Sequence, residues 1–94
     1  MFAGKSAFLQ GGITLIEIYE ETGDRWVHRE LLLLADPDEG MVNRYLAQGF
    51  QLVARVDGQI AGEVVMVPAE NGWELKNLAV LPAFQKAGVG RALV

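Results

Sequence analysis

The stretch NLAVLPAFQKAGVGRAL, residues 77–93, decides the fold of this chain. Residues 77–80 are suited to a strand, and Pro82 stops strand pairing because it has no N–H to donate. Gly88 and Gly90 let the backbone approach a ligand closely, and good helix formers follow them. The stretch therefore predicts a strand, a glycine-containing loop and a helix start, whose free backbone N–H groups suit a phosphate.

Two helices are expected upstream, because their start signals are present. Asp24 is placed to cap a helix in which apolar residues recur at helical spacing. Asp36 at an N-cap, Pro37 at the first helical position and Glu39 three residues after the cap predict the start of a second helix. Gly49 is placed to end that helix.

The remaining segments are predicted to be strands, because they are β-branched, apolar and short. Asp57 and Gly58 form a hairpin signal between two of them, and Gly62 indicates a bulge or a close backbone approach. The strands are expected at residues 13–19, 50–56, 59–67 and 73–80. The order β-α-α-β-β-β plus the start of a helix predicts an α+β fold, a mainly antiparallel sheet with helices packed on it.

Composition excludes several classes of protein. The chain has 94 residues, no cysteine and one histidine, so disulfides and thiolate sites are excluded and no metal site is expected. No apolar run is long enough for a membrane span, and we expect a cytoplasmic protein. Residues 1–12 are interpreted as a flexible N-terminal arm or leader, which leaves residues 13–94 as one partial domain.

Charge is distributed unevenly along the chain. The formal net charge of −4 argues against a nucleic-acid partner. All twelve acidic residues lie between Glu17 and Glu74, whereas residues 75–94 hold three basic residues and no acid. This distribution is compatible with chance in a short window, but it also favours an anion site near the C-terminal loop.

The C-terminal stretch resembles the signature of the GNAT superfamily of N-acetyltransferases. That signature is an apolar strand ending in Ala-Val, a Pro two residues later, then Gln or Arg, two residues of any type, Gly, any residue, and Gly or Ala. The segment QKAGVG, residues 85–90, fits every position. The resemblance extends over residues 13–94 and includes bacterial small-molecule acetyltransferases.

The resemblance implies that acetyl-CoA is the cosubstrate and that an amine attacks its thioester directly. Main-chain groups of the last strand would pair with the pantetheine arm, and amides of the loop would hold the pyrophosphate. The residues implied in cosubstrate binding are Leu78, Ala79, Val80, Gln85, Lys86, Ala87, Gly88, Val89, Gly90 and Arg91. The amine acceptor is not readable from the sequence.

Glu74 is the candidate general base, because some members of the superfamily carry a catalytic Glu at this spacing before the Ala-Val pair. Burial near the thioester would raise the pKa of such a carboxyl. The alternative is an exposed Glu at the start of a strand. Strand alternation places Asn77 on the face opposite Glu74, where it would bond a loop or the acceptor.

Other polar residues have two interpretations each. Asp36, Asp38 and Glu39 lie between the two expected helices, where they would either line a site for a cationic amine or cap the helix. His28 is expected to be solvated on an amphipathic helix.

Members of the superfamily continue beyond the loop with further strands and another helix. The sequence given stops earlier, so residues 73–80 are expected to form an unpaired sheet edge that a second copy would cover, giving a homodimer. Whether the single chain catalyses the reaction therefore stays an open question. The alternatives are an acetyltransferase completed by self-association, a non-catalytic CoA-binding module, and a folded remnant without function.

Overall fold

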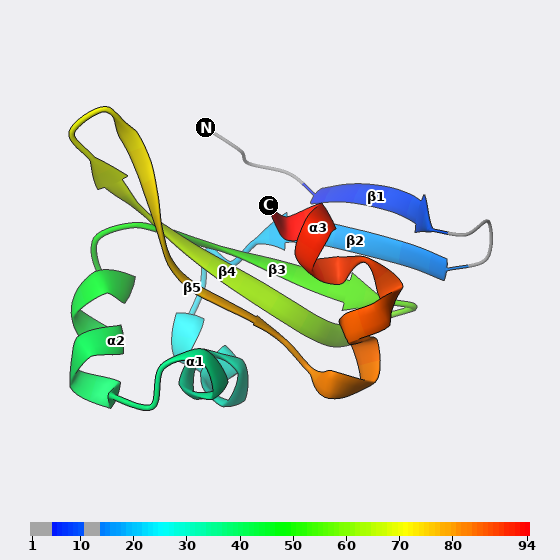
Figure 1. Cartoon of the computed structure of the whole chain (residues 1–94), viewed down its shortest axis with the longest axis horizontal. Helices are drawn as coiled ribbons and strands as arrows, with labels where there is room; N and C mark the ends of the chain where they lie inside the picture. Colours follow the sequence, from blue (N-terminus) through cyan, green and yellow to red (C-terminus); the bar gives the residue numbers. More distant parts are fainter. Residues whose placement is uncertain (1–4, 11–13) are drawn as a thin grey trace.

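A five-stranded antiparallel sheet forms the centre of the protein, with its strands in chain order (Figure 1). The computed structural model describes residues 5–10 and 14–94. The strands are β1 Lys5–Gln10, β2 Thr14–Glu20, β3 Phe50–Val56, β4 Gln59–Ala69 and β5 Gly72–Val80. The helical segments are the 3₁₀ turns η1 Arg25–His28 and η2 Pro82–Ala87 and the helices α1 Arg29–Ala35, α2 Glu39–Leu46 and α3 Val89–Leu93. The predicted α+β class and antiparallel sheet are confirmed.

Strand β1 differs from the sequence-based prediction. The sequence predicts a flexible arm or leader at residues 1–12, but Lys5–Gln10 pairs with β2 in register from Lys5↔Tyr19 to Gln10↔Thr14. This pairing satisfies main-chain groups of β2 that would otherwise be left at an open edge. A short apolar run with glycines on both sides gives only a weak strand signal in the sequence. The rest of the expected arm, residues 1–4 and 11–12, lies outside the described residues.

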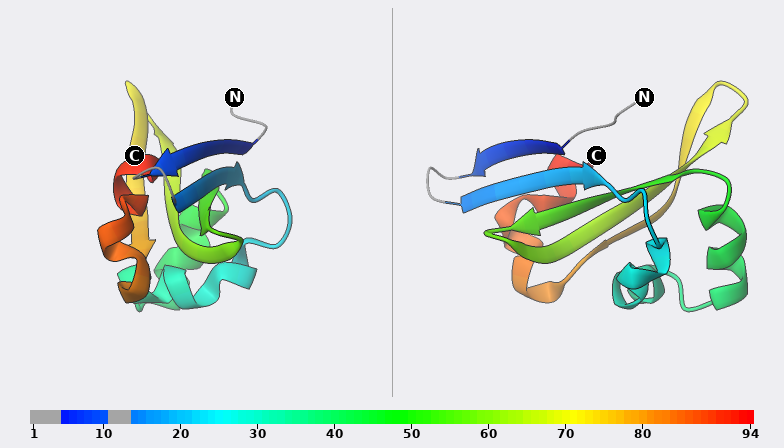
Figure 2. Two further views of the ribbon diagram at one scale, coloured as in Figure 1. Left: turned by 90° about the vertical axis from the view of Figure 1, so that its right-hand side faces the viewer. Right: turned by 180° about the vertical axis from the view of Figure 1, so that it is seen from behind.

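Helices cover both faces of the sheet (Figure 2). On one face α1 and α2 pack over β4 and β5, and on the other face α3 packs across β2, β3, β4 and β5. The cluster beneath α1 and α2 comprises Leu32, Val42, Tyr45, Leu46, Val65 and Val67. The cluster beneath α3 comprises Ile16, Ile18, Ala54, Val56, Ala61, Val64, Val89 and Leu93. Alternation along β4 supplies both clusters, because Val64 and Val65 point to opposite faces.

The helix caps agree with the sequence in one case and differ in another. Asp24 caps as predicted, with its side chain accepting a hydrogen bond from the Trp26 N–H at 3.0 Å, although the first turn is 3₁₀. The N-cap of α2 is Asp38, which accepts from the Met41 N–H at 3.1 Å. The predicted cap, Asp36, instead ends α1, because the residue before a proline favours an extended backbone.

Two glycines allow close backbone packing. A Cβ on Gly49 would lie 1.8 Å from the Met66 carbonyl oxygen of β4, so Gly49 is required for the approach of two strands and does not end α2, whose C-cap is Ala47. A Cβ on Gly62 would lie 2.9 Å from the Ala79 carbonyl oxygen and 3.1 Å from Val89 Cγ1. The expected close approach at Gly62 is therefore confirmed, and it seats α3 on the sheet.

Candidate functional site

Within residues 5–10 and 14–94, no strand pairs with the outer edge of β5. β5 ends the sheet order, and the Leu81 N–H donates to the Ala61 carbonyl oxygen at 2.8 Å, toward β4. Because antiparallel pairing alternates along a strand, the N–H and C=O groups of Leu78 and Val80 point away from β4, whereas those of Ala79 face it. The Val80 carbonyl oxygen accepts a hydrogen bond from Gln85 Nε2 at 3.3 Å.

The loop after β5 leads directly into α3. Gly88 adopts the left-handed conformation with φ of 82° and ψ of 14°, which glycine reaches without strain. The Ala92 N–H donates to the Gly88 carbonyl oxygen at 3.0 Å, so the helical ladder starts at Gly88 and leaves the first N–H groups of α3 outside it. Val89 and Leu93 anchor α3 in the core. The predicted strand, loop and helix are thus brought together at one end of the sheet.

The side chains predicted for this loop are placed only in part. Gln85 and Arg91 are exposed, and Gly90 is half-buried. A Cβ atom added to Gly90 would lie 3.9 Å from Val80 Cγ2, which is an ordinary van der Waals distance. The side chains of Lys86 and Ala87 lie outside the described residues. The loop backbone and the β5 edge nevertheless lie next to each other through the bond between Gln85 and Val80.

A bulge in β5 changes which residues share a face. Val65 pairs with Asn77 and Met66 pairs with Leu75, so Lys76 is the extra residue. Glu74 opposite Val67 and Asn77 opposite Val65 therefore lie on the same face. The expectation that they point to opposite faces is wrong, because strand alternation does not continue through a bulge.

Glu74 lies in solvent and pairs with its neighbour. Its side chain is 57% exposed, and Glu74 Oε2 lies 3.4 Å from Lys76 Nζ. The general-base hypothesis requires a buried carboxyl, but the Glu74 carboxyl is exposed in this structure. The role of Glu74 as a general base stays a prediction.

Asn77 connects β5 to the helices. It is 2% exposed, and its Nδ2 donates to the Leu32 carbonyl oxygen at 3.1 Å and to the Tyr45 hydroxyl at 2.8 Å. The Tyr45 hydroxyl donates to Asp36 Oδ2 at 3.2 Å, and burial raises the pKa of this phenol. Because the Leu32 carbonyl only accepts, the orientation of the Asn77 amide is fixed. This chain of bonds holds the connection between α1 and α2 over β5.

The acidic residues of that connection already have structural partners. Asp36 Oδ1 accepts from the Asp38 N–H at 3.1 Å, and Asp38 caps α2. Glu39 pairs with Arg29 on the surface. The capping interpretation accounts for Asp38, whereas the Asp36 carboxylate accepts from the Asp38 N–H and the Tyr45 hydroxyl. A role of these residues toward an amine stays a prediction.

Sequence reasoning missed a buried carboxyl in β4. Glu63 is 0% exposed, and its Oε1 accepts from Gln51 Nε2 at 3.3 Å. Burial raises the pKa of Glu63 to about 8, although the bond from Gln51 acts in the opposite direction. Glu63 Oε2, Gln51 Oε1 and Asn77 Oδ1 have no hydrogen-bond partner among the described residues. A charged residue within the apolar strand, residues 60–67, was the available signal.

His28 also departs from expectation, since it is buried and not solvated. It is 8% exposed, and its Nε2 lies 2.7 Å from Glu21 Oε1. The hydrogen bond with His28 lowers the pKa of Glu21. Glu21 directly follows β2, so the partner of His28 comes from the segment that leaves the sheet.

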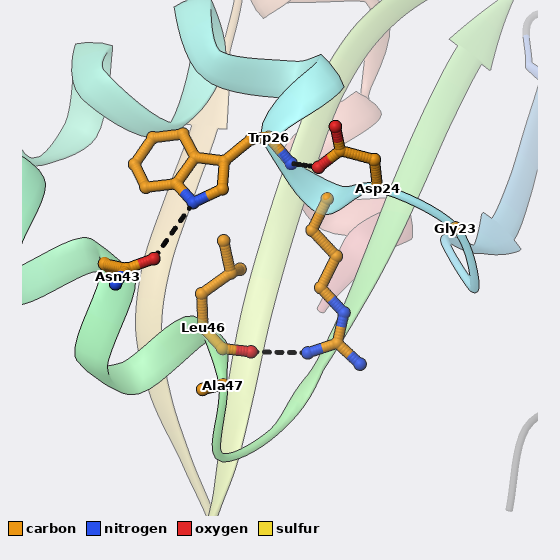
Figure 3. A pocket seen from close by; sticks show the side chains of 7 residues that line it. Gly23, Asp24, Trp26, Asn43, Leu46 and Ala47 are labelled. Carbon is orange, nitrogen blue, oxygen red and sulfur yellow. Dashed lines mark hydrogen bonds between the residues drawn. The ribbon is translucent and has the colours of Figure 1, made fainter.

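A separate hollow of about 380 Å³ lies between η1 and the end of α2 (Figure 3). Its polar groups serve the fold. Trp26 Nε1 donates to Asn43 Oδ1 at 3.1 Å (Figure 3), and Arg25 Nη1 donates to the carbonyl oxygens of Leu46 and, at 2.8 Å, Gly49. Arg25 thus satisfies carbonyl groups at the C-terminal end of α2, where a cation is favourable.

Residues 5–10 and 14–94 contain no group of three or more His, Cys, Asp and Glu residues arranged to hold a metal ion. None of the helices described here has the length and apolar character needed to cross a membrane.

Comparisons with known proteins agree with this geometry. Residues 47–94 match the family model described as "Acetyltransferase (GNAT) domain". The chain is 39% identical over 80 residues to the uncharacterized N-acetyltransferase YvbK of Bacillus subtilis (strain 168). The matched region is 84% of this chain and 50% of YvbK.

Two solved structures resemble the protein. A GNAT family acetyltransferase from Elizabethkingia anophelis with acetyl-CoA bound gives a TM-score of 0.75 at 35% identity, over 83% of this chain and 52% of that chain. A Bacillus subtilis acetyltransferase in complex with CoA gives a TM-score of 0.73 at 32% identity, over 81% of this chain and 51% of that chain.

The chain spans about half the length of these relatives. The matched family model includes β3, β4, β5, the glycine loop and α3, which are the elements that form the candidate site. By sequence and by fold, the chain belongs to the GNAT acetyltransferase family.

Proposed function

We propose that this chain binds acetyl-CoA along the free edge of β5 and the loop that follows, as part of an N-acetyltransferase acting on an amine. The observation that supports this most directly is the continuity of the two features. The outward main-chain groups of Leu78 and Val80 lead within a few residues to the left-handed Gly88. Two family relatives of similar structure were solved with acetyl-CoA or CoA bound.

The chemistry of acetyl-CoA fits these groups. Pantetheine contains amides, which pair with strand-edge N–H and C=O groups as an added strand does. Pyrophosphate oxygens accept from backbone N–H groups in a glycine loop. The Val80 carbonyl is held by Gln85 in the free protein, so we expect the ligand to displace this side chain. The proposed reaction is direct attack of a neutral amine on the thioester.

Replacing Gly88 with valine is expected to abolish acetyl-CoA binding, because a β-branched residue resists the left-handed conformation that shapes the loop. Isothermal titration with acetyl-CoA measures the loss. Gly58→Val is a matched control, since Gly58 has a similar φ of 86° in the β3–β4 turn. It should cost comparable stability and leave binding intact. Absence of heat or thermal shift with millimolar acetyl-CoA and the wild type would refute the proposal.

If the protein turns over, Glu74→Gln is expected to lower the rate most strongly at neutral pH. The loss should be about 10²- to 10⁴-fold there and smaller at high pH, where free amine is abundant. A pH–rate profile with a simple amine tests this, and Glu70→Gln is a control for removing one exposed carboxylate from the same hairpin. An unchanged profile removes Glu74 from the mechanism. Binding without turnover would instead favour a CoA-binding module.

We also propose that two copies associate along β5 in the cytoplasm, where acetyl-CoA is available. The edge adjoins an apolar groove of about 220 Å³ lined by Phe50, Leu52, Val64, Met66, Leu75, Leu93 and Val94. Trp73, which packs edge-on against Phe50 with ring centroids 5.0 Å apart, extends this apolar surface. A two-fold contact at residues 73–76 would cover these groups and leave Leu78 and Val80 free.

Light scattering at micromolar concentration is expected to give the mass of a dimer for the wild type. Leu75→Lys should give a monomer, because it places a charge in the proposed contact. Leu34→Lys is the control, since Leu34 is similarly exposed on α1. A well-folded wild-type monomer would contradict the association.

A further inference from the structure

Three buried side-chain oxygens occupy neighbouring positions on the face of the sheet that α1 and α2 cover. They are Gln51 Oε1, Glu63 Oε2 and Asn77 Oδ1, and none has a hydrogen-bond partner among the described residues. Because Val65 pairs with Gln51 on one side and with Asn77 on the other, Glu63 is the diagonal neighbour of both. Diagonal neighbours are about 7 to 8 Å apart, a separation that long side chains bridge.

The hydrogen-bond donors of this cluster are too few for an ionised Glu63. Gln51 Nε2 donates to Glu63 Oε1 at 3.3 Å. Asn77 Nδ2 already donates to the Leu32 carbonyl and to the Tyr45 hydroxyl, so it has no hydrogen left for Glu63. A proton on Glu63 Oε2 supplies a donor to the amide oxygens, whereas ionisation adds a charge to a group of acceptors.

The described side chains also provide no cation for an ionised Glu63. Each basic side chain described on the elements around the cluster has another partner. The pairs are Arg25 with the carbonyl oxygens of Leu46 and Gly49, His28 with Glu21, Arg29 with Glu39, Arg44 with Met41 Sδ, Arg55 with Glu17, and Lys76 with Glu74. Among the remaining titratable groups, Tyr45 donates to Asp36, Tyr19 lies under Arg55, and Glu30 is exposed. A buried carboxylate without a partner is strongly unfavourable.

The segment over the cluster consists of η1, α1 and α2, residues 25–46, and is called the helical cover below (Figure 2). Its helices have 7 and 8 residues, so they depend on packing against the sheet. That packing consists of the apolar cluster around Leu32 and Tyr45 and the two bonds from Asn77. The apolar cluster beneath α3 contains no residue of the cover. The cover can therefore leave the sheet while α3 stays packed on the opposite face.

We propose that the protonation state of Glu63 controls the position of the helical cover: the neutral carboxyl keeps the cover closed on β4 and β5, and ionisation opens it as a unit. Opening hydrates the carboxylate and separates Asn77 from Leu32 and Tyr45. Burial raises the pKa of Glu63 to about 8, so closure is favoured at low pH and is lost as pH rises toward that value. This device does not depend on the binding of acetyl-CoA.

Hydrogen exchange of the full chain, followed by NMR, tests the proposal. The protection of each amide, corrected for its intrinsic exchange rate, is compared at about pH 6 and about pH 8. In the wild type we expect the protection of α1 and α2 amides to fall by about 30- to 100-fold, because opening releases the Glu63 proton over most of this range. Their protection should be lower than that of β3 and β4 amides and less sensitive to urea, since opening exposes less surface than unfolding.

Glu63→Gln should abolish this fall in protection, because the side chain no longer titrates. Glu63→Met, which is uncharged and of similar length, provides the same comparison if the added amide disturbs the packing. Glu30→Gln is the matched control, since it removes an exposed carboxylate from α1 and should keep the wild-type fall.

Three results would overturn the proposal. Equal protection and equal urea dependence for the cover and for β3 and β4 would show that the cover does not open as a unit. A fall that persists in the uncharged Glu63 variants would assign the opening to another group. Wild-type protection of α1 and α2 that is the same at both pH values would show that Glu63 does not control the cover.

Discussion

Replacing Glu63 with glutamine is expected to make the protein more stable than the wild type at pH 8 and to remove most of a decline in stability with rising pH. Glu63 is fully buried, and burial raises its pKa from the ordinary 4.5 to about 8. At pH values between these two pKa values, the Glu63 carboxyl is ionised in the unfolded chain and protonated in the folded protein. The free energy of unfolding therefore falls as pH rises through this window and levels off above the folded-state pKa.

The size of this decline is about 5 kcal/mol, as an order of magnitude, from the separation of the two pKa values. Glutamine at residue 63 keeps an oxygen that accepts from Gln51 Nε2. It also adds a donor beside the Gln51 amide, whose Oε1 has no hydrogen-bond partner among the described residues. Urea unfolding at about pH 5 and about pH 8 measures the effect, with Glu20→Gln on β2 as the control. A wild type whose stability does not fall over this range would contradict a protonated Glu63.

Gly49→Ala is expected to have the largest effect on folding of any small substitution considered. Its methyl group would lie 1.8 Å from the Met66 carbonyl oxygen and 2.9 Å from Val67 Cα. These are backbone atoms of the buried strand β4, so the clash is relieved only by shifting a strand. We expect a loss of at least about 3 kcal/mol, which lowers the melting temperature by more than about 12 °C in a domain of this size.

Gly40→Ala is the matched control for this prediction. Gly40 lies in α2 on the surface, where an added Cβ atom would come no closer than 3.5 Å to a neighbouring atom, Asp38 Oδ1. The same substitution should here raise stability by about 0.5 to 1 kcal/mol, since alanine favours a helix. Circular dichroism melts of the two variants should shift in opposite directions. A melting temperature for Gly49→Ala within a few degrees of the wild type would show that β3 and β4 are not held as described.

The sequence by itself determined the features that depend on neighbouring residues. Strand β5, the stop at Pro82, the glycine loop and the start of α3 all follow from backbone preferences within a few positions. The β3–β4 turn at Asp57 and Gly58 is predictable for the same reason. These local signals also supported the family and the position of the candidate cosubstrate site.

Only the tertiary structure decided where the polar side chains lie. Asn77 bonds to Leu32, 45 positions earlier in the chain, and its face is set by the bulge at Lys76, which strand alternation does not reveal. His28 is buried because Glu21 at the end of β2 provides a partner, and Glu63 is buried because the helices cover its face of β4. Burial, protonation and pairing depend on elements that meet after folding, whereas a sequence pattern reports only the preference of each segment.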